Sequence, residues 1–152
     1  MISNNFQRNM DGILIGRSNG NTAFHNNFID NLRFNARNNG VDPDLNFWNN
    51  SHEGNFWDDY VGNDTDLDGL GDDPYTVLES NQDNHPLMGP FTAFNTSVGK
   101  YVNVISNSTI QDFQYFEVNN TIRMQVLNMT KNQSHGFCRV TIPWEYLLHH
   151  ST

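Results

Sequence analysis

Residues 2–9 read Ile-Ser-Asn-Asn-Phe-Gln-Arg-Asn, and residues 24–31 read Phe-His-Asn-Asn-Phe-Ile-Asp-Asn. Both stretches follow the pattern apolar-x-Asn-Asn-Phe-x-x-Asn, so the motif recurs after about 22 residues, a spacing typical of structural repeats. Between them, residues 12–15 (Gly-Ile-Leu-Ile) form a second short apolar run. Two short strands in a repeat of this length predict a right-handed parallel β-helix, whose coils stack apolar side chains inward. Leucine-rich repeats have a similar period but need a regular leucine framework, which is missing here.

The Asn pairs Asn4-Asn5 and Asn26-Asn27 have two structural explanations. Asn tolerates the left-handed backbone needed at coil corners, and stacked Asn side chains form hydrogen-bonded ladders. Asn fills about one position in six, several times its ordinary share. We therefore expect these Asn residues to be structural and not sugar-binding.

Residues 64–73 read Asp-Thr-Asp-Leu-Asp-Gly-Leu-Gly-Asp-Asp. The first half matches the D-x-D-x-D-G part of an EF-hand ligand set, but the twelfth position is Tyr75, which supplies no bidentate carboxylate. The spacing resembles the shorter calcium loops of dockerins and thrombospondin type 3 repeats. We predict a Ca²⁺ site within residues 64–75, with these ligands: Asp64, Asp66, Asp68, the carbonyl of Leu70, Asp72 and Asp73. The alternative is a solvated Asp-Gly turn that needs no ion.

Charge is distributed unevenly along the chain. Twelve of the 17 acidic residues lie between Asn38 and Gly99, a stretch without Lys or Arg. Such a segment cannot bind a phosphate backbone or an anionic membrane surface electrostatically. Nucleic acid is therefore not an expected partner, whereas cations are.

An aromatic pair occurs twice before the Asp-rich loop, at residues 47–48 and 56–57, and Tyr60 follows. These side chains suit either a sugar-stacking platform or a hydrophobic plug that closes the end of the β-helix. We favour the plug, because a small calcium loop needs an apolar anchor nearby.

Four motifs in order, at residues 24–31, 54–60, 64–75 and 81–88, followed by Pro90, resemble the closing coils of NosD-like right-handed β-helix proteins. These belong to a wider group of carbohydrate-binding proteins and sugar hydrolases. The resemblance covers residues 1–92 and implies a parallel β-helix that ends in an Asp-rich loop. It also raises copper delivery as a function. Copper prefers clustered His, Met or Cys, but the candidates are scattered: His25, His52, His85, Met88 and the terminal pair His149-His150.

After Pro90 the pattern changes. Residues 121–127 and 138–143 alternate apolar and polar side chains, which predicts half-buried antiparallel strands. We expect a partial β-sandwich-like domain over residues 95–152, similar to a small β domain at the C-termini of archaeal surface proteins and truncated near Thr152. It is either a spacer or a ligand-binding domain.

The sequence thus predicts an all-β, non-catalytic fragment of an extracellular or cell-surface protein, with the periplasm as another location. Expected partners are surface glycans or other surface proteins. No run is long enough for a membrane span, and no signal peptide precedes the first repeat. An alternative is a polysaccharide lyase or hydrolase whose active coils lie upstream, and a second is a NosD-like periplasmic copper-delivery protein. Glycosylation is expected among the Asn-x-Ser/Thr acceptors, which are Asn49, Asn63, Asn95, Asn107, Asn119, Asn128 and Asn132.

Overall fold

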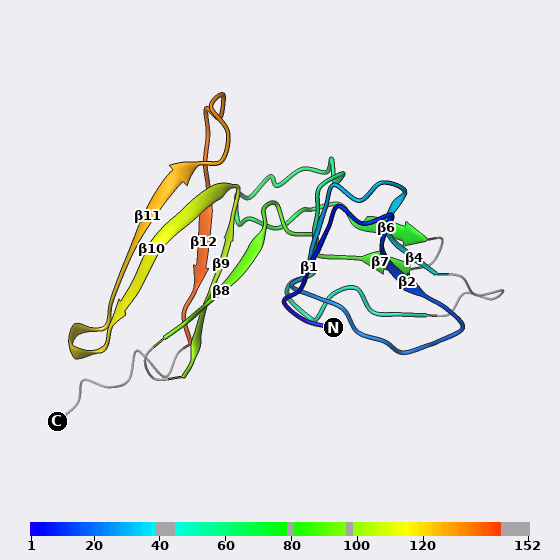
Figure 1. Ribbon diagram of the computed structural model, residues 1–152, viewed down its shortest axis with the longest axis horizontal. Helices are drawn as coiled ribbons and strands as arrows, with labels where there is room; N and C mark the ends of the chain where they lie inside the picture. The colour runs from blue at the N-terminus through cyan, green and yellow to red at the C-terminus, as the bar shows by residue number, and fades with distance from the viewer. Residues whose placement is uncertain (39–44, 79–80, 97–98, 144–152) are drawn as a thin grey trace. The chain divides into compact units, whose positions relative to one another are not determined.

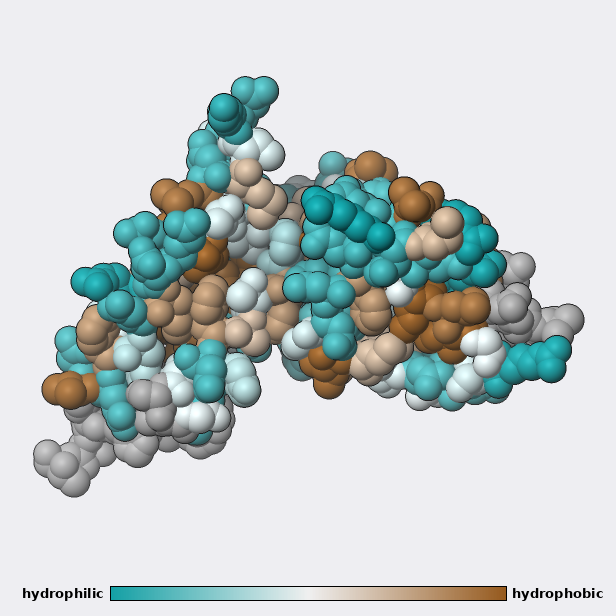
Figure 2. Space-filling model, in the orientation of Figure 1, coloured by the Kyte–Doolittle hydropathy of each residue, from teal (hydrophilic) through white to brown (hydrophobic). Residues whose placement is uncertain are grey.

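The regular secondary structure of the protein is almost entirely β in a computed structural model that describes residues 1–38, 45–78, 81–96 and 99–143 (Figure 1). Its chain divides into two compact units, residues 1–91 and 92–152. Within the described residues the helical content is one 3-10 turn, η1 (Glu117–Asn119). None of the described residues forms a helix long and apolar enough to cross a membrane. Hydrophilic residues cover much of the face in Figure 2, with apolar patches between them.

Parallel strand pairs organise the first unit. Strands β1 (Asn5–Gln7), β3 (Asn27–Ile29) and β5 (Phe56–Trp57) form one sheet in the order β1-β3-β5. Strands β2 (Asp11–Ile15) and β4 (Phe34–Asn38) form a second parallel pair. The predicted repeat is confirmed, because each residue of β1 pairs in register with the residue of β3 that takes its place in the second copy of the motif.

The segment after β5 leads through the Asp-rich loop to an antiparallel pair, β6 (Tyr75–Leu78) and β7 (Asn81–Asp83). Beyond this pair the chain returns to the parallel sheet, where Leu87 forms a parallel bridge with Phe56. Leu87 is fully buried. The C-terminal part of the first unit therefore pairs with the same sheet that contains the unit's first strand.

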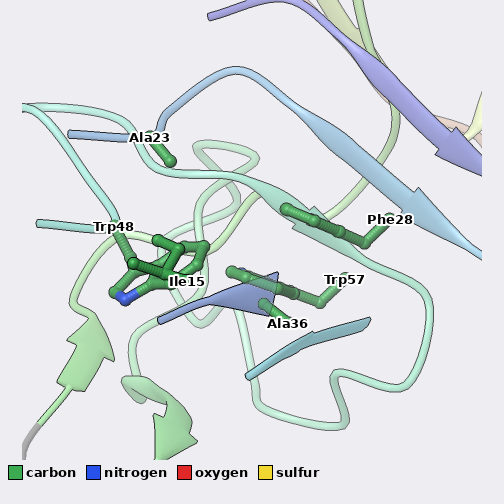
Figure 3. Close-up of a cluster of buried hydrophobic side chains, with 6 residues drawn as sticks. All are labelled: Ile15, Ala23, Phe28, Ala36, Trp48 and Trp57. Carbon is green, nitrogen blue, oxygen red and sulfur yellow. The ribbon is translucent and has the colours of Figure 1, made fainter. Parts of the chain in front are cut away.

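Aromatic side chains from successive strands form the core of the first unit. The rings of Phe6, Phe28, Trp57 and Tyr75 stack in one column, with centroid separations of 5.0, 4.3 and 4.3 Å. Figure 3 shows the nearly parallel rings of Phe28 and Trp57 beside Trp48. Trp48 and Trp57 are each 1% exposed, so these two side chains are part of the core and are not available to stack on a sugar.

Left-handed backbone recurs at matching positions of the first two repeats, but not at the Asn pairs. Positive φ angles occur at Ser3 and His25 (58° and 57°) and at Arg8 and Asp30 (55° and 52°), and the second residue of each pair replaces the first in the next repeat. The Asn pairs have no positive φ. The prediction that Asn supplies the left-handed corners is therefore wrong for these residues. The predicted ladder is observed instead, because the Asn side chains hydrogen-bond from one repeat to the next.

The second unit contains two small sheets. One has the order β8-β9-β12 and is built from β8 (Phe91–Asn95, which begins at the unit boundary), β9 (Tyr101–Ser106) and β12 (Cys138–Thr141). The other is the antiparallel hairpin of β10 (Ser108–Phe116) and β11 (Thr121–Asn128). The rings of Phe94 and Phe113 stack at 4.3 Å. The predicted strands at 121–127 and 138–143 are confirmed, apart from the last two residues of the second.

Candidate metal centre

Main-chain contacts anchor the Asp-rich loop to the core of the first unit. Gly71 donates its N–H to the carbonyl of Pro86 at 2.7 Å, and Met88 donates to the carbonyl of Gly69 at 3.0 Å. Leu70 and Leu87 form an antiparallel bridge. The loop is thus held from its middle, so that its acidic half, residues 64–68, projects from a fixed base.

A tight turn shapes that acidic half. Leu67 and Gly69 have positive φ angles of 61° and 86°. The two carboxylate oxygens of Asp64 accept the backbone N–H groups of Asp68 (3.0 Å) and Gly69 (2.9 Å). Asp68 Oδ1 accepts the N–H of Leu70 at 2.8 Å. Gly69 therefore permits the backbone reversal of this turn, because its missing side chain allows a positive φ.

Three of the predicted ligands approach one another closely. One oxygen from each of Asp64, Asp66 and Asp68 lies within 4.8 Å of the others. Asp64 is half-buried, and the other two are exposed. Three carboxylates at this separation repel one another unless a counter-charge is present. Hard oxygen donors in a tight loop are the chemistry that Ca²⁺ prefers.

Asp72 and Asp73 do not belong to this three-carboxylate group. Asp72 Oδ2 accepts the N–H of Thr65 at 2.8 Å, and hydrogen bonds from Thr65 lower the pKa of Asp72. The carbonyl of Asp73 accepts the hydroxyl of Tyr60 at 2.7 Å. Asp72 therefore closes the loop on itself, and Asp73 fixes a neighbouring aromatic ring.

Among the described residues, no three His or Cys side chains lie close enough together to share a copper ion. His25 Nε2 lies 2.7 Å from Glu53 Oε2, both side chains are buried, and the His25 ring stacks on Phe91 at 4.1 Å. Within the described residues, the Asp64–Asp66–Asp68 set is the one group of three His, Cys, Asp or Glu side chains close enough to share an ion. The pair His149-His150 lies outside those residues.

A ladder of amide side chains runs through the parallel repeats. Asn26 Oδ1 accepts the backbone N–H and the side-chain amide of Asn4, at 3.1 and 3.0 Å. Asn55 Oδ1 accepts the same two groups of Asn26, at 3.1 and 2.9 Å. A second ladder joins three further residues: Asn46 Oδ1 accepts both groups of Asn21, and Asn81 Oδ1 accepts the backbone N–H of Asn46. Amides suit such rows because each donates and accepts at once.

The first ladder ends in Asp83, a residue whose part the sequence motifs did not reveal. Asp83 Oδ2 accepts the N–H of Asn55 at 2.7 Å and the indole N–H of Trp57 at 2.9 Å, while Oδ1 accepts the N–H of His85 at 3.1 Å. Asp83 is fully buried, and burial raises its pKa to about 6. A carboxylate suits this final position because it accepts on both oxygens. Spacing gave no clear signal, because consecutive members of the ladder lie 22, 29 and 28 residues apart.

Comparison with known proteins gives one match. Residues 1–62 match a family model described as periplasmic copper-binding protein (NosD). No curated protein and no solved structure matches the chain significantly. The matched region contains the parallel strands β1 to β5 and ends just before the Asp-rich loop. This N-terminal part of the chain is therefore NosD-like.

Proposed function

We propose that this chain is a non-catalytic part of a cell-surface, extracellular or periplasmic protein. In this proposal residues 1–91 are the closing coils of a right-handed parallel β-helix, and residues 64–75 bind a structural Ca²⁺ ion. Residues 92–152 are a partial β-sandwich-like domain. The two parallel sheets, the amide ladders and the NosD-like match support the β-helix.

The observation that carries the calcium proposal is the convergence of Asp64, Asp66 and Asp68 within 4.8 Å. All three offer hard carboxylate oxygens, which suit Ca²⁺ and not Cu⁺. The carbonyl of Leu70, Asp72 and Asp73 are the remaining proposed ligands. A bound ion would remove the repulsion among the carboxylates.

Calcium at this position would stabilise the whole first unit. The loop bonds to the segment that carries Leu87 and Pro86, and Leu87 is buried in the same unit. An ion that binds the folded loop and not the unfolded chain adds its binding free energy to folding. The biological role would be attachment to surface glycans or to surface proteins.

Thermal unfolding tests the calcium site. In chelator and then in Ca²⁺ at about 100 times its dissociation constant, the midpoint should rise by about 5–10 °C. A variant that combines Asp64→Asn, Asp66→Asn and Asp68→Asn should lose this rise, whereas Asp112→Asn in the second unit should keep it. An equal rise in the triple variant, or none in the native chain, would refute the site.

Copper delivery is the second candidate, because the matching family model describes a periplasmic copper-binding protein. This function requires tight copper binding that persists in excess Ca²⁺. It also requires that His→Ala substitutions abolish the binding. Copper displaced by Ca²⁺ would instead mark adventitious binding to the carboxylates.

A further inference from the structure

A pocket of about 380 Å³ opens between residues 59–62 and residues 73–76, beside the Asp-rich loop. Pockets of this volume accommodate small molecules. The residues that matter for its chemistry are two acids, two tyrosines and a glycine: Asp59, Asp73, Tyr60, Tyr75 and Gly62.

The two tyrosine rings form walls at a steep angle. Their centroids are 6.5 Å apart, and their planes are inclined by 67°. Tyr75 stacks on Trp57 at 4.3 Å and donates its hydroxyl to Asp59 Oδ2 at 3.2 Å. Tyr60 donates its hydroxyl to the carbonyl of Asp73 at 2.7 Å. Both rings are fixed by these contacts, which reduces the entropy that ligand binding would cost.

Two glycines make room for the Tyr60 ring. A Cβ atom at Gly62 or at Gly71 would collide with that ring. The two glycines therefore let the hydroxyl end of the Tyr60 ring lie close to the loop backbone beside the pocket.

The charge of the pocket is negative. Asp59 and Asp73 are exposed, and neither forms a salt bridge with any residue that the structure describes. The partners of Asp59 are neutral, namely the amide of Asn35 at 2.8 Å and the hydroxyl of Tyr75. Burial raises the pKa of both tyrosines, so they stay neutral phenols at physiological pH.

We propose that this pocket binds an alkylammonium group, and a quaternary ammonium best of all. Aromatic faces and nearby carboxylates both attract a cation. Each Asp59 oxygen already accepts a hydrogen bond, so Asp59 supplies negative charge more readily than a further acceptor. A quaternary ammonium has no N–H to satisfy, whereas a neutral sugar would make no use of the charge. Asp59 is the acid on which the proposal depends, because Asp73 is also a proposed Ca²⁺ ligand and would share its charge with a bound ion.

Choline and its neutral isostere 3,3-dimethylbutan-1-ol are the probes for calorimetric titration of the whole chain in saturating Ca²⁺. Choline should bind saturably, and the neutral isostere about tenfold more weakly or not at all. Equal binding of the two would overturn the proposal, because it would show an apolar pocket without cation selectivity. No saturable choline binding, or binding abolished by Ca²⁺, would overturn it too.

Two substitutions locate the site. Asp59→Asn removes one charge without changing shape and should weaken choline binding about fivefold to tenfold. Tyr60→Leu should weaken it similarly, with near-ultraviolet circular dichroism to verify the fold. The control is Asp112→Asn, an exposed position in the second unit whose left-handed backbone (φ 50°) Asn tolerates. Equal losses in Asp59→Asn and Asp112→Asn would refute the pocket.

A cationic headgroup can be free or carried by a lipid, so a vesicle experiment separates the sources. Retention of the native chain, but not of Asp59→Asn, on phosphatidylcholine vesicles supports a lipid headgroup. Choline binding without vesicle retention supports a free ligand.

Discussion

Asp83 is a buried carboxylate at the end of a row of amides. Burial raises its pKa and outweighs four hydrogen bonds that lower it, two from Asn55 and one each from Trp57 and His85. The folded state therefore binds a proton at Asp83 more tightly than the unfolded chain does. Between about pH 4 and 6, this residue's contribution to stability falls as the pH rises.

Asp83→Asn should remove that pH dependence. Relative to the native chain, the variant's free energy of unfolding should increase by on the order of 3 kcal/mol between pH 4 and pH 7. Whether Asp83→Asn raises or lowers the free energy of unfolding at a single pH is less informative, because the new side-chain amide also faces the N–H of His85. Urea unfolding at several pH values measures the difference, and curves that run parallel would show that Asp83 does not titrate in this window. Asp112→Asn serves as the control for an exposed acid.

The sequence pointed to some residues of the site and not to others. Asp64, Asp66 and Asp68 could be proposed together because alternation along one loop is a local pattern. Asp83 could not, because its partner Asn55 is distant in the chain and the spacing between repeats is no longer that of the first two copies. Tyr75 was missed for a similar reason. Its ring is the last in the aromatic column, but its strand β6 pairs with β7 and not with the parallel sheet that supplies the other rings.

At the scale of elements, the amide ladder contributes most where it is shielded from water. Asn26 is fully buried and hydrogen-bonds to Asn4 on one side and Asn55 on the other. Asn4 is exposed at the first position. Buried polar groups that lose a partner cost about 1–3 kcal/mol each, whereas exposed ones are compensated by water.

Asn26→Ala should therefore destabilise the chain by about 2–4 kcal/mol, and Asn4→Ala by less than about 1 kcal/mol. The free energy of unfolding in urea, at one pH and with Ca²⁺ present, gives both values. Losses of similar size in the two variants would mean that burial does not decide the ladder's contribution.

Strand identity was largely predictable from local pattern. The offset between the first two repeats and the alternating strands of the second unit agree with the structure. The left-handed backbone at the corners could not be predicted, because no local pattern distinguishes Ser3, Arg8, His25 and Asp30 from their neighbours. Their left-handed backbone recurs at the matching position of both repeats, which ties it to the repeat and not to residue type.

At the scale of the whole molecule, Phe91 completes the first unit. Its N–H and carbonyl bond to the side chain of Asn27 at 2.7 and 2.8 Å, and its ring stacks on His25. Phe91 is 5% exposed. These contacts all lie within residues 1–91.

A fragment of residues 1–91 should therefore fold on its own in Ca²⁺. Tryptophan fluorescence should report buried Trp48 and Trp57 and one cooperative unfolding transition. Phe91→Ala in the same fragment should lower its stability by about 3 kcal/mol or more. A fragment with solvent-exposed tryptophans would show instead that the first unit needs residues 92–152.

The ladder that ends at Asp83 also bears on how such proteins change length in evolution. Every Asn in the row donates its backbone N–H and its side-chain amide to one oxygen of the next member. One more repeat could therefore be duplicated, or one lost, without altering its neighbours. The carboxylate of Asp83 accepts hydrogen bonds but has no amide group to donate to a further member. The row therefore ends because of the chemistry of this one residue. Genes of this type could therefore vary in repeat number while the terminal segment is inherited intact.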